Sequence, residues 1–243
     1  MKAYQRIIRE QEEKNEKGQL SLIKTKPDRV DIKKAIVKEV SYNTAKKIIL
    51  KYEWLGTMVG TSKHYGIFFD GYLGGVVCYG HPTARMGYGG YVGDKYASFG
   101  IQLSRGACVY WAHEHSASKL IGASLKILKN EGYKYAVAFS DPAAGEVGTV
   151  YQATNWYYTG IERERRRFQI VYKHTGKLYL SERHFHKKHG YKNLESFLSE
   201  NPGLIFVKGH EKAKYIKLIG SKTENKEMMK TLRGRIKPYP KRN

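Results

Sequence analysis

The chain has 243 residues, of which 41% are hydrophobic, and it carries 44 Lys and Arg against 22 Asp and Glu. This length fits one sizeable domain with extensions, and the apolar fraction is enough for a core. The 2 cysteines are too few for a disulfide framework, and no apolar run is long enough to span a bilayer. Because the N-terminus is charged and lacks an apolar stretch, we expect no signal peptide, no membrane partner and a cytoplasmic location.

The net charge of +22 is unevenly distributed along the chain. Residues 54–160 carry 8 basic and 6 acidic side chains, whereas residues 161–243 carry 22 basic and 8 acidic ones. A nearly neutral middle between basic ends is typical of a reaction domain held against a polyanion, because cations that neutralise phosphates release counterions. We therefore predict double-stranded DNA as the partner. Charge that serves solubility alone is the alternative, and the oligomeric state stays open between a monomer and a homodimer.

The first hundred residues contain clear local signals. Residues 1–30 are predicted to form a short helix and a linker, residues 35–40 a strand, and residues 41–52 a helix capped by Ser41 or Asn43. Residues 66–80 hold two apolar runs around an Asp-Gly pair, which predicts a tight hairpin. Residues 81–98 contain several glycines and little periodicity, so we predict a long loop.

Further along the chain, we predict a strand at 101–111, a helix at 116–131, a buried strand at 135–139, a short helix within 145–155 and a hairpin at 161–179. This order is that of acyl-CoA-dependent N-acetyltransferases of the GNAT type. The expected fold class is therefore α/β (α+β), with a mixed central sheet flanked by helices. We divide the chain into a basic N-terminal helix and linker (1–33), a GNAT-like catalytic domain (34–180) and a basic C-terminal DNA-binding extension (181–243).

Four segments are more specific than these patterns. They are Glu53-Trp-Leu-Gly56 with His64-Tyr65-Gly66, the stretch from Leu103 to Ala112, the stretch from Ser140 to Trp156, and the terminal Pro-Tyr-Pro-Lys-Arg. Together they resemble the Mom family of bacteriophage DNA-modification proteins, from about residue 34 to the C-terminus. The resemblance implies an acetyltransferase-like fold. It also implies conversion of adenine in DNA to N6-(carbamoylmethyl)adenine, which shields phage DNA from restriction endonucleases.

Asp141 is the first candidate for chemistry, because it follows a buried strand and active sites in open α/β sheets gather at the carboxyl ends of strands. It would act as a general base toward the exocyclic amine or as a metal ligand, with a helix cap as the alternative. Tyr151 and Trp156 would stack on an adenine extruded from the duplex, or pack in the core. Arg105, in a strand bound for the core, calls for an anionic partner such as Asp141, Glu146 or a cofactor phosphate.

The start of the helix after the fourth strand is the predicted cofactor site, because helix N-termini bind anions. Its residues are Ser116, Ala117, Ser118 and Lys119. Acetyltransferases usually carry a glycine-rich loop here, whereas this chain has no glycine before Gly122. The predicted donor is therefore acetyl-CoA or another small molecule.

The product implied by the resemblance also suggests a metal. A carbamoylmethyl group joins nitrogen through its CH2 carbon, which plain acyl transfer does not attack. An activated carbon centre is needed, so iron is a candidate cofactor. His64, Tyr65 and Asp141 are the predicted ligands, with a loop histidine and an edge aromatic as the alternative.

The predicted contacts to the DNA backbone are basic residues of the C-terminal third, together with Trp156. They are Arg165, Arg166, Arg167, Arg183, Lys187 and Lys188. The combined prediction is a transferase that modifies adenine N6 in DNA. The alternatives are a GNAT-class N-acetyltransferase that acts on another amine and a nucleic-acid-binding protein without catalytic activity.

Overall fold

The structure is a computed structural model. It describes residues 4–17, 26–27, 29–53, 55–82, 85–142, 145–162, 168–174, 178–190, 193–208 and 211–241. None of the described helices combines the length and the apolar character needed to cross a membrane.

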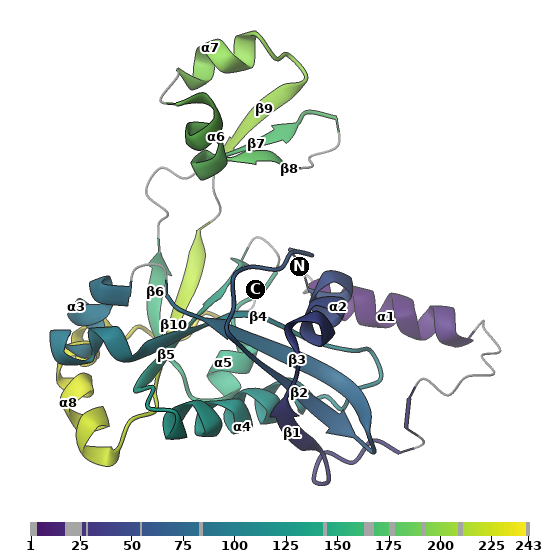
Figure 1. Cartoon of the computed structure of the whole chain (residues 1–243), viewed down its shortest axis with the longest axis vertical. Helices are drawn as coiled ribbons and strands as arrows, with labels where there is room; N and C mark the ends of the chain where they lie inside the picture. The colour runs from purple at the N-terminus through teal and green to yellow at the C-terminus, as the bar shows by residue number, and fades with distance from the viewer. Residues whose placement is uncertain are drawn as a thin grey trace. The chain divides into compact units, whose positions relative to one another are not determined.

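The chain forms two compact units (Figure 1). The larger unit comprises Met1–Ile161 and Ala213–Asn243, and the smaller unit comprises Glu162–Lys212. This division differs from the predicted boundaries at residues 34 and 181. The reason is that residues 213–243 return to the larger unit, where they supply a strand of its sheet, instead of forming a separate extension.

A seven-stranded mixed sheet of order β1-β2-β3-β4-β5-β10-β6 forms the centre of the larger unit (Figure 1). Strands β1 to β4 are antiparallel to one another, β4 and β5 are parallel, and β5 and β10 are antiparallel. This arrangement confirms the predicted mixed sheet. The strands are β1 (Ile36–Glu39), β2 (Lys63–Phe69), β3 (Tyr72–Gly80), β4 (Gly100–Cys108), β5 (Tyr135–Ser140), β10 (Lys212–Leu218) and β6 (Tyr157–Glu162).

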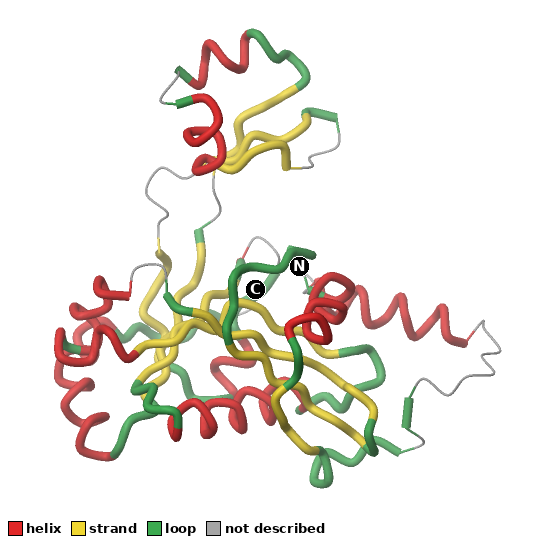
Figure 2. Tube along the Cα trace, in the orientation of Figure 1, coloured by secondary structure: helices red, strands yellow, loops and turns green. Residues whose placement is uncertain are grey.

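Helices cover both faces of this sheet (Figure 2). They are α1 (Tyr4–Lys17), α2 (Tyr42–Tyr52), α3 (Gly89–Val92), α4 (Ser116–Asn130), α5 (Thr149–Ala153) and α8 (Lys222–Leu232). Tyr79 of β3 hydrogen-bonds to Ser124 of α4 at 2.7 Å, which identifies the α4 face. Val137 of β5 points to the opposite face, where it packs in a cluster with Met228 and Leu232 of α8.

Most local predictions in the larger unit are confirmed. The hairpin of β2 and β3 turns at Asp70 and Gly71, both with positive φ, as an Asp-Gly turn requires. Ser41 caps α2, since its side chain accepts from the amide of Thr44. The prediction of a long loop at 81–98 is wrong. Residues 85–99 form a short helix of 3-10 type, Arg85–Tyr88, then α3, then a second 3-10 helix, Asp94–Phe99. Buried Tyr88, Val92 and Tyr96 hold these turns against the sheet.

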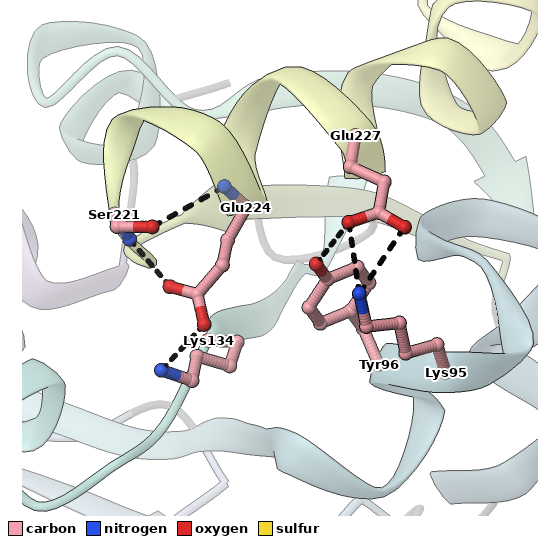
Figure 3. A network of polar contacts seen from close by, with 6 residues as sticks. All are labelled: Lys95, Tyr96, Lys134, Ser221, Glu224 and Glu227. Carbon is pink, nitrogen blue, oxygen red and sulfur yellow. Dashed lines mark hydrogen bonds and ion pairs between the residues drawn. The ribbon is translucent and has the colours of Figure 1, made fainter.

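Acidic side chains attach helix α8 to its neighbours (Figure 3). The Ser221 hydroxyl accepts from the amide of Glu224 at 3.2 Å, and the Glu224 carboxylate accepts from the amide of Ser221 at 2.7 Å. This carboxylate also forms an ion pair with Lys134 at 2.7 Å. One turn further, Glu227 accepts a hydrogen bond from the Tyr96 hydroxyl. The helix therefore starts at a capping box and is tied to the body of the unit.

The smaller unit has its own three-stranded sheet of order β8-β7-β9 and its own core. Its elements are β7 (Phe168–Tyr172), β8 (Leu178–Ser181), α6 (Glu182–His189), α7 (Leu194–Ser199) and β9 (Leu204–Lys208). Strands β7 and β8 are antiparallel, so a hairpin is present in the predicted region, but it spans residues 168–181 and not 161–179. Residues 161–162 belong to β6 of the seven-stranded sheet, and the turn at 175–177 lies outside the described residues. Buried Ile170, Phe185, Phe197 and Leu204 form the core.

Candidate active site

A cavity of about 280 Å³ lies where β4 and β5 separate. These parallel strands pair from Gly100 with Tyr135 to Leu103 with Ala138, whereas β4 continues to Cys108 and β5 to Ser140. The diverging ends line the cavity together with residues 146–151 and part of α4. Ligand sites in open α/β sheets occur at such carboxyl ends. We therefore take this wedge as the candidate active site.

A bulge in β4 shapes one wall of the cavity. Cys78 of β3 pairs with Arg105 and Tyr79 pairs with Leu103, so Ser104 is an extra residue on β4. The Arg105 guanidinium donates to the carbonyls of Ser104 at 2.7 Å and of Thr57 at 2.8 Å. The same side chain lies 3.8 Å from the Glu53 carboxylate. The sequence predicted Asp141, Glu146 or a cofactor phosphate as the anionic partner of Arg105, with a structural ion pair as the alternative. The carboxylate beside it in the structure is that of Glu53, which also lines the cavity.

Glu146 is the titratable side chain of the wedge whose pKa lies close to neutrality. Burial is the main cause that raises the pKa of Glu146 to about 7, and the charges of Glu53 and Asp141 raise it further. A carboxyl group with such a pKa is partly ionised at neutral pH and can accept a proton from a bound substrate. The arrangement therefore provides a general base at the cavity wall.

Asp141, the first candidate from the sequence, lies at the end of β5 and is half-buried. Its carbonyl accepts the amide of Glu146 at 3.1 Å, which closes the turn between the two residues. Glu146 lines the cavity, and the negative charge of the nearby Asp141 raises the pKa of Glu146. Asp141 therefore lies next to the candidate site, and the carboxylate at the cavity wall is that of Glu146.

Tyr151 and Trp156 have different surroundings. Tyr151 of α5 lines the cavity, and burial raises the pKa of its phenol, which therefore stays protonated. Trp156 is 0% exposed and its ring centre lies 5.2 Å from that of Tyr151. The prediction that Trp156 contacts DNA is wrong for this structure, because the indole is part of the core. Tyr151 remains a candidate at the cavity.

The three predicted metal ligands do not come together. His64 and Tyr65 are consecutive on β2, so their side chains point to opposite faces of the sheet. The His64 imidazole shares a hydrogen bond of 2.9 Å with Thr61, and the Tyr65 hydroxyl donates to Glu131 at 3.3 Å. Strands β3 and β4 separate β2 from β5, which carries Asp141 at its end.

The ionisation states of these side chains agree with that geometry. Burial raises the pKa of Tyr65, which disfavours the phenolate that a metal ligand would need. Among the described residues, no group of three His, Cys, Asp or Glu side chains is placed to hold a metal ion. The predicted iron site is therefore not supported by the residues that were assigned to it.

The predicted cofactor residues at the start of α4 are only partly available. Ala117 lines the cavity, whereas the Ser116 side chain is buried. The Ser118 hydroxyl donates to the carbonyl of His115 at 2.9 Å. The Lys119 ammonium group donates to the carbonyls of Ile32 at 2.5 Å and Lys33 at 3.2 Å, so it already has two protein partners.

The predicted DNA contacts fall in the smaller unit. Arg165, Arg166 and Arg167 lie outside the described residues, as does the side chain of Arg183. Lys187 and Lys188 are exposed on α6. Their role in DNA binding stays a prediction.

Sequence reasoning missed several residues of the wedge. From the sequence, Glu53 is named only as part of a motif and Glu146 only as a possible partner of Arg105. No role is assigned to Ser140 or Cys108. Ser140 is buried and lines the cavity. The one available signal was that Glu146 lies inside the specific segment 140–156. Its burial and its neighbours depend on the tertiary structure.

The model of the Mom protein family matches residues 34–241. Comparison with curated proteins finds no match.

Among solved structures, the chain is similar to an IAA acetyltransferase from Bacillus cereus, with 11% identity, a TM-score of 0.42, and coverage of 76% of this chain and 99% of that one. It is similar to the ribosomal-protein-S18-alanine N-acetyltransferase from Escherichia coli, with 6% identity, a TM-score of 0.43, and coverage of 76% and 94%. A third similar structure is a GNAT family acetyltransferase from Elizabethkingia anophelis with acetyl-CoA bound, with 10% identity, a TM-score of 0.43, and coverage of 76% and 97%.

Proposed function

Because the chain belongs to the Mom protein family, we propose that it is a transferase that modifies the N6 amine of adenine in DNA. The product that we propose is N6-(carbamoylmethyl)adenine, which protects DNA against restriction endonucleases. The observation that carries the chemical part of this proposal is the placement of Glu146. Its carboxyl group lines a cavity between diverging strands and has a pKa of about 7.

The reaction needs a base because adenine N6 is a weak nucleophile whose lone pair is delocalised into the ring. In the proposed step, N6 forms a bond to the CH2 carbon of the donor, and that carbon releases its leaving group with the bonding electrons. The N6 proton passes to the carboxylate of Glu146. A base whose pKa lies near the working pH is suited to this transfer.

The adenine must leave the duplex to reach this base, because N6 is engaged in pairing. Apolar and aromatic side chains, among them Phe139 and Tyr151, line the wedge and can pack against the extruded base. The protonated phenol of Tyr151 provides a hydrogen-bond donor at the same wall. Arg105, held by Ser104 and Thr57, keeps a positive charge beside Glu53.

The donor that we propose is a small molecule with a carboxamide and a leaving group on its CH2 carbon. Ser140 and Ala117 line the cavity, and the hydroxyl of Ser140 can bond to a polar group of the donor. Acetyl-CoA is a weaker candidate, because Lys119 is already bound to a carbonyl and the helix start lacks a glycine-rich turn.

The test is mass spectrometry of nucleosides from the DNA of cells that express the chain. We expect a deoxyadenosine derivative heavier by one carbamoylmethyl group, and an amount lower by roughly 100-fold or more in cells that express the matched Glu146→Gln variant. Unmodified adenine in cells that contain the folded wild-type chain would overturn the proposed function. A different mass on adenine would retain the substrate and replace the donor.

A further inference from the structure

Helix α8 carries a row of basic residues on the side that faces away from the body of the protein. Lys222, Lys226 and Lys230 follow one another at intervals of four residues, and Arg233 comes three residues later. Side chains at such intervals lie on one stripe of a helix. All four are exposed, whereas Met228 and Leu232 of the same helix are buried. We call these four residues the α8 stripe.

The acidic residues of α8 form hydrogen bonds and ion pairs with residues outside this stripe, although the charge of Lys230 also acts on Glu227. Glu224 is bound to Ser221 and Lys134, and Glu227 accepts hydrogen bonds from Tyr96 and Lys95 (Figure 3). Both carboxylates therefore serve to attach the helix. The α8 stripe therefore presents positive charge to solvent. The contacts of Glu224 and Glu227 hold the helix that carries it against its neighbours.

A set of stacked cations and aromatic rings lies between α8 and the cavity. Arg235, just after the stripe, stacks on the Tyr91 ring at 4.5 Å. Lys214 of β10 lies over the same ring at 4.7 Å and 5.8 Å from the ring of Phe139. Phe139 lines the cavity. Positive charge is thus present from α8 to the cavity wall, on the sheet face that α8 covers.

We propose that the α8 stripe binds the phosphate backbone of DNA and positions the duplex for delivery of a base to the cavity, an inference that rests on the proposed function. The spacing of the charges agrees with such a partner. Eleven residues of helix span about 17 Å, which is about the length of five phosphates along one strand at roughly 3.4 Å each. A polyanion of regular spacing complements this row, and each neutralised phosphate releases counterions.

The experiment measures the affinity of the full chain for a short DNA duplex across a range of salt concentrations. The test variant replaces the stripe by glutamine, as Lys222→Gln, Lys226→Gln, Lys230→Gln and Arg233→Gln. A matched control removes the same number of exposed charges from the turn before β1 and from α4, as Lys33→Gln, Lys34→Gln, Lys126→Gln and Lys129→Gln. Single changes at Lys226 and Lys230 serve if the fourfold variant does not fold.

We expect the slope of log affinity against log salt to fall by roughly 0.9 for each stripe contact that is lost, and to stay unchanged in the control. A stripe variant with the wild-type slope, or a control that loses as much slope, would overturn the inference. The Glu146→Gln variant separates this result from the proposed function. It should bind DNA with the wild-type slope while modifying none, whereas a wild-type chain that binds no DNA would overturn both proposals.

Discussion

The wedge between β4 and β5 and the end of β2 both bury ionisable side chains, and the two regions treat them differently. In the wedge, the pKa of Glu146 is raised to about 7, toward the pH at which proteins work. At β2, burial lowers the pKa of His64 and raises that of Tyr65, so both are held in their neutral forms. The difference arises because burial favours the neutral form of every group, which raises the pKa of an acid and lowers that of a base. Of these three groups, only the carboxylic acid, whose ordinary pKa is low, has its pKa moved toward neutrality by burial.

The partners of these side chains differ in the same way. Glu146 faces a cavity beside other carboxylates, whereas Tyr65 donates to Glu131 and His64 bonds to Thr61. A satisfied buried group stabilises the fold, and a group that faces a cavity can act on a ligand. The comparison therefore separates a reactive region from a structural one within one sheet, and the following predictions test that separation.

The largest expected effect is on activity at the wedge. Changing Glu146→Gln should lower the rate of DNA modification by roughly 100- to 10,000-fold, because a positioned general base contributes that much. The matched control is Asp141→Asn, five residues earlier on the same turn, which should retain activity within a few-fold. Its pH–rate profile should shift to lower pH, since the Asp141 charge helps to raise the pKa of Glu146. Equal losses in the two variants would contradict the assignment of the base.

The second prediction concerns stability and pH. The ordinary pKa of 4.5 applies to Glu146 in the unfolded chain, and the folded value is about 7. As the pH rises, Glu146 therefore loses its proton at a lower pH in the unfolded chain than in the folded protein, where the charged form is buried. The free energy of unfolding of the wild type, relative to that of Glu146→Gln, should fall between these two pH values by on the order of 3 kcal/mol and level off above them.

Denaturant unfolding of the two proteins across this pH range is the measurement. The relative stability should be highest at the acidic end, where Glu146 is protonated in both states. A difference that does not depend on pH, or one that grows as the pH rises, would show that burial does not raise the pKa of Glu146.

The smallest expected effect is at β2. Changing Tyr65→Phe removes the hydrogen bond to Glu131 and should lower the free energy of unfolding by about 1 kcal/mol. DNA modification should continue at the wild-type rate, because the side chain packs in the core against α4. Loss of modification in a Tyr65→Phe protein that remains folded would show that Tyr65 takes part in the reaction. The contrast between the two regions would then be wrong.

Much of the fold could be predicted from local signals. The Asp-Gly turn, the Ser41 cap and the periodic helix at 116–131 each depend on interactions within a few residues, and the structure confirms them. The segment at 81–98 could not be predicted in this way. Its short helices are stabilised by packing of Tyr88 and Tyr96 onto the sheet and α8, and those contacts join residues far apart in the chain.

The sequence by itself determined the basic charge, the order of strands and helices, the family resemblance and the region after β5 where the candidate site lies. Tertiary structure alone decided which groups that region contains. Strand alternation puts His64 and Tyr65 on opposite faces, the separation of β4 from β5 opens the cavity, and packing buries Trp156. The pKa of Glu146 follows from burial and from the charge of Glu53, which comes from a helix far earlier in the chain. Such effects depend on distances between residues in space, and these cannot be read from their separation along the chain.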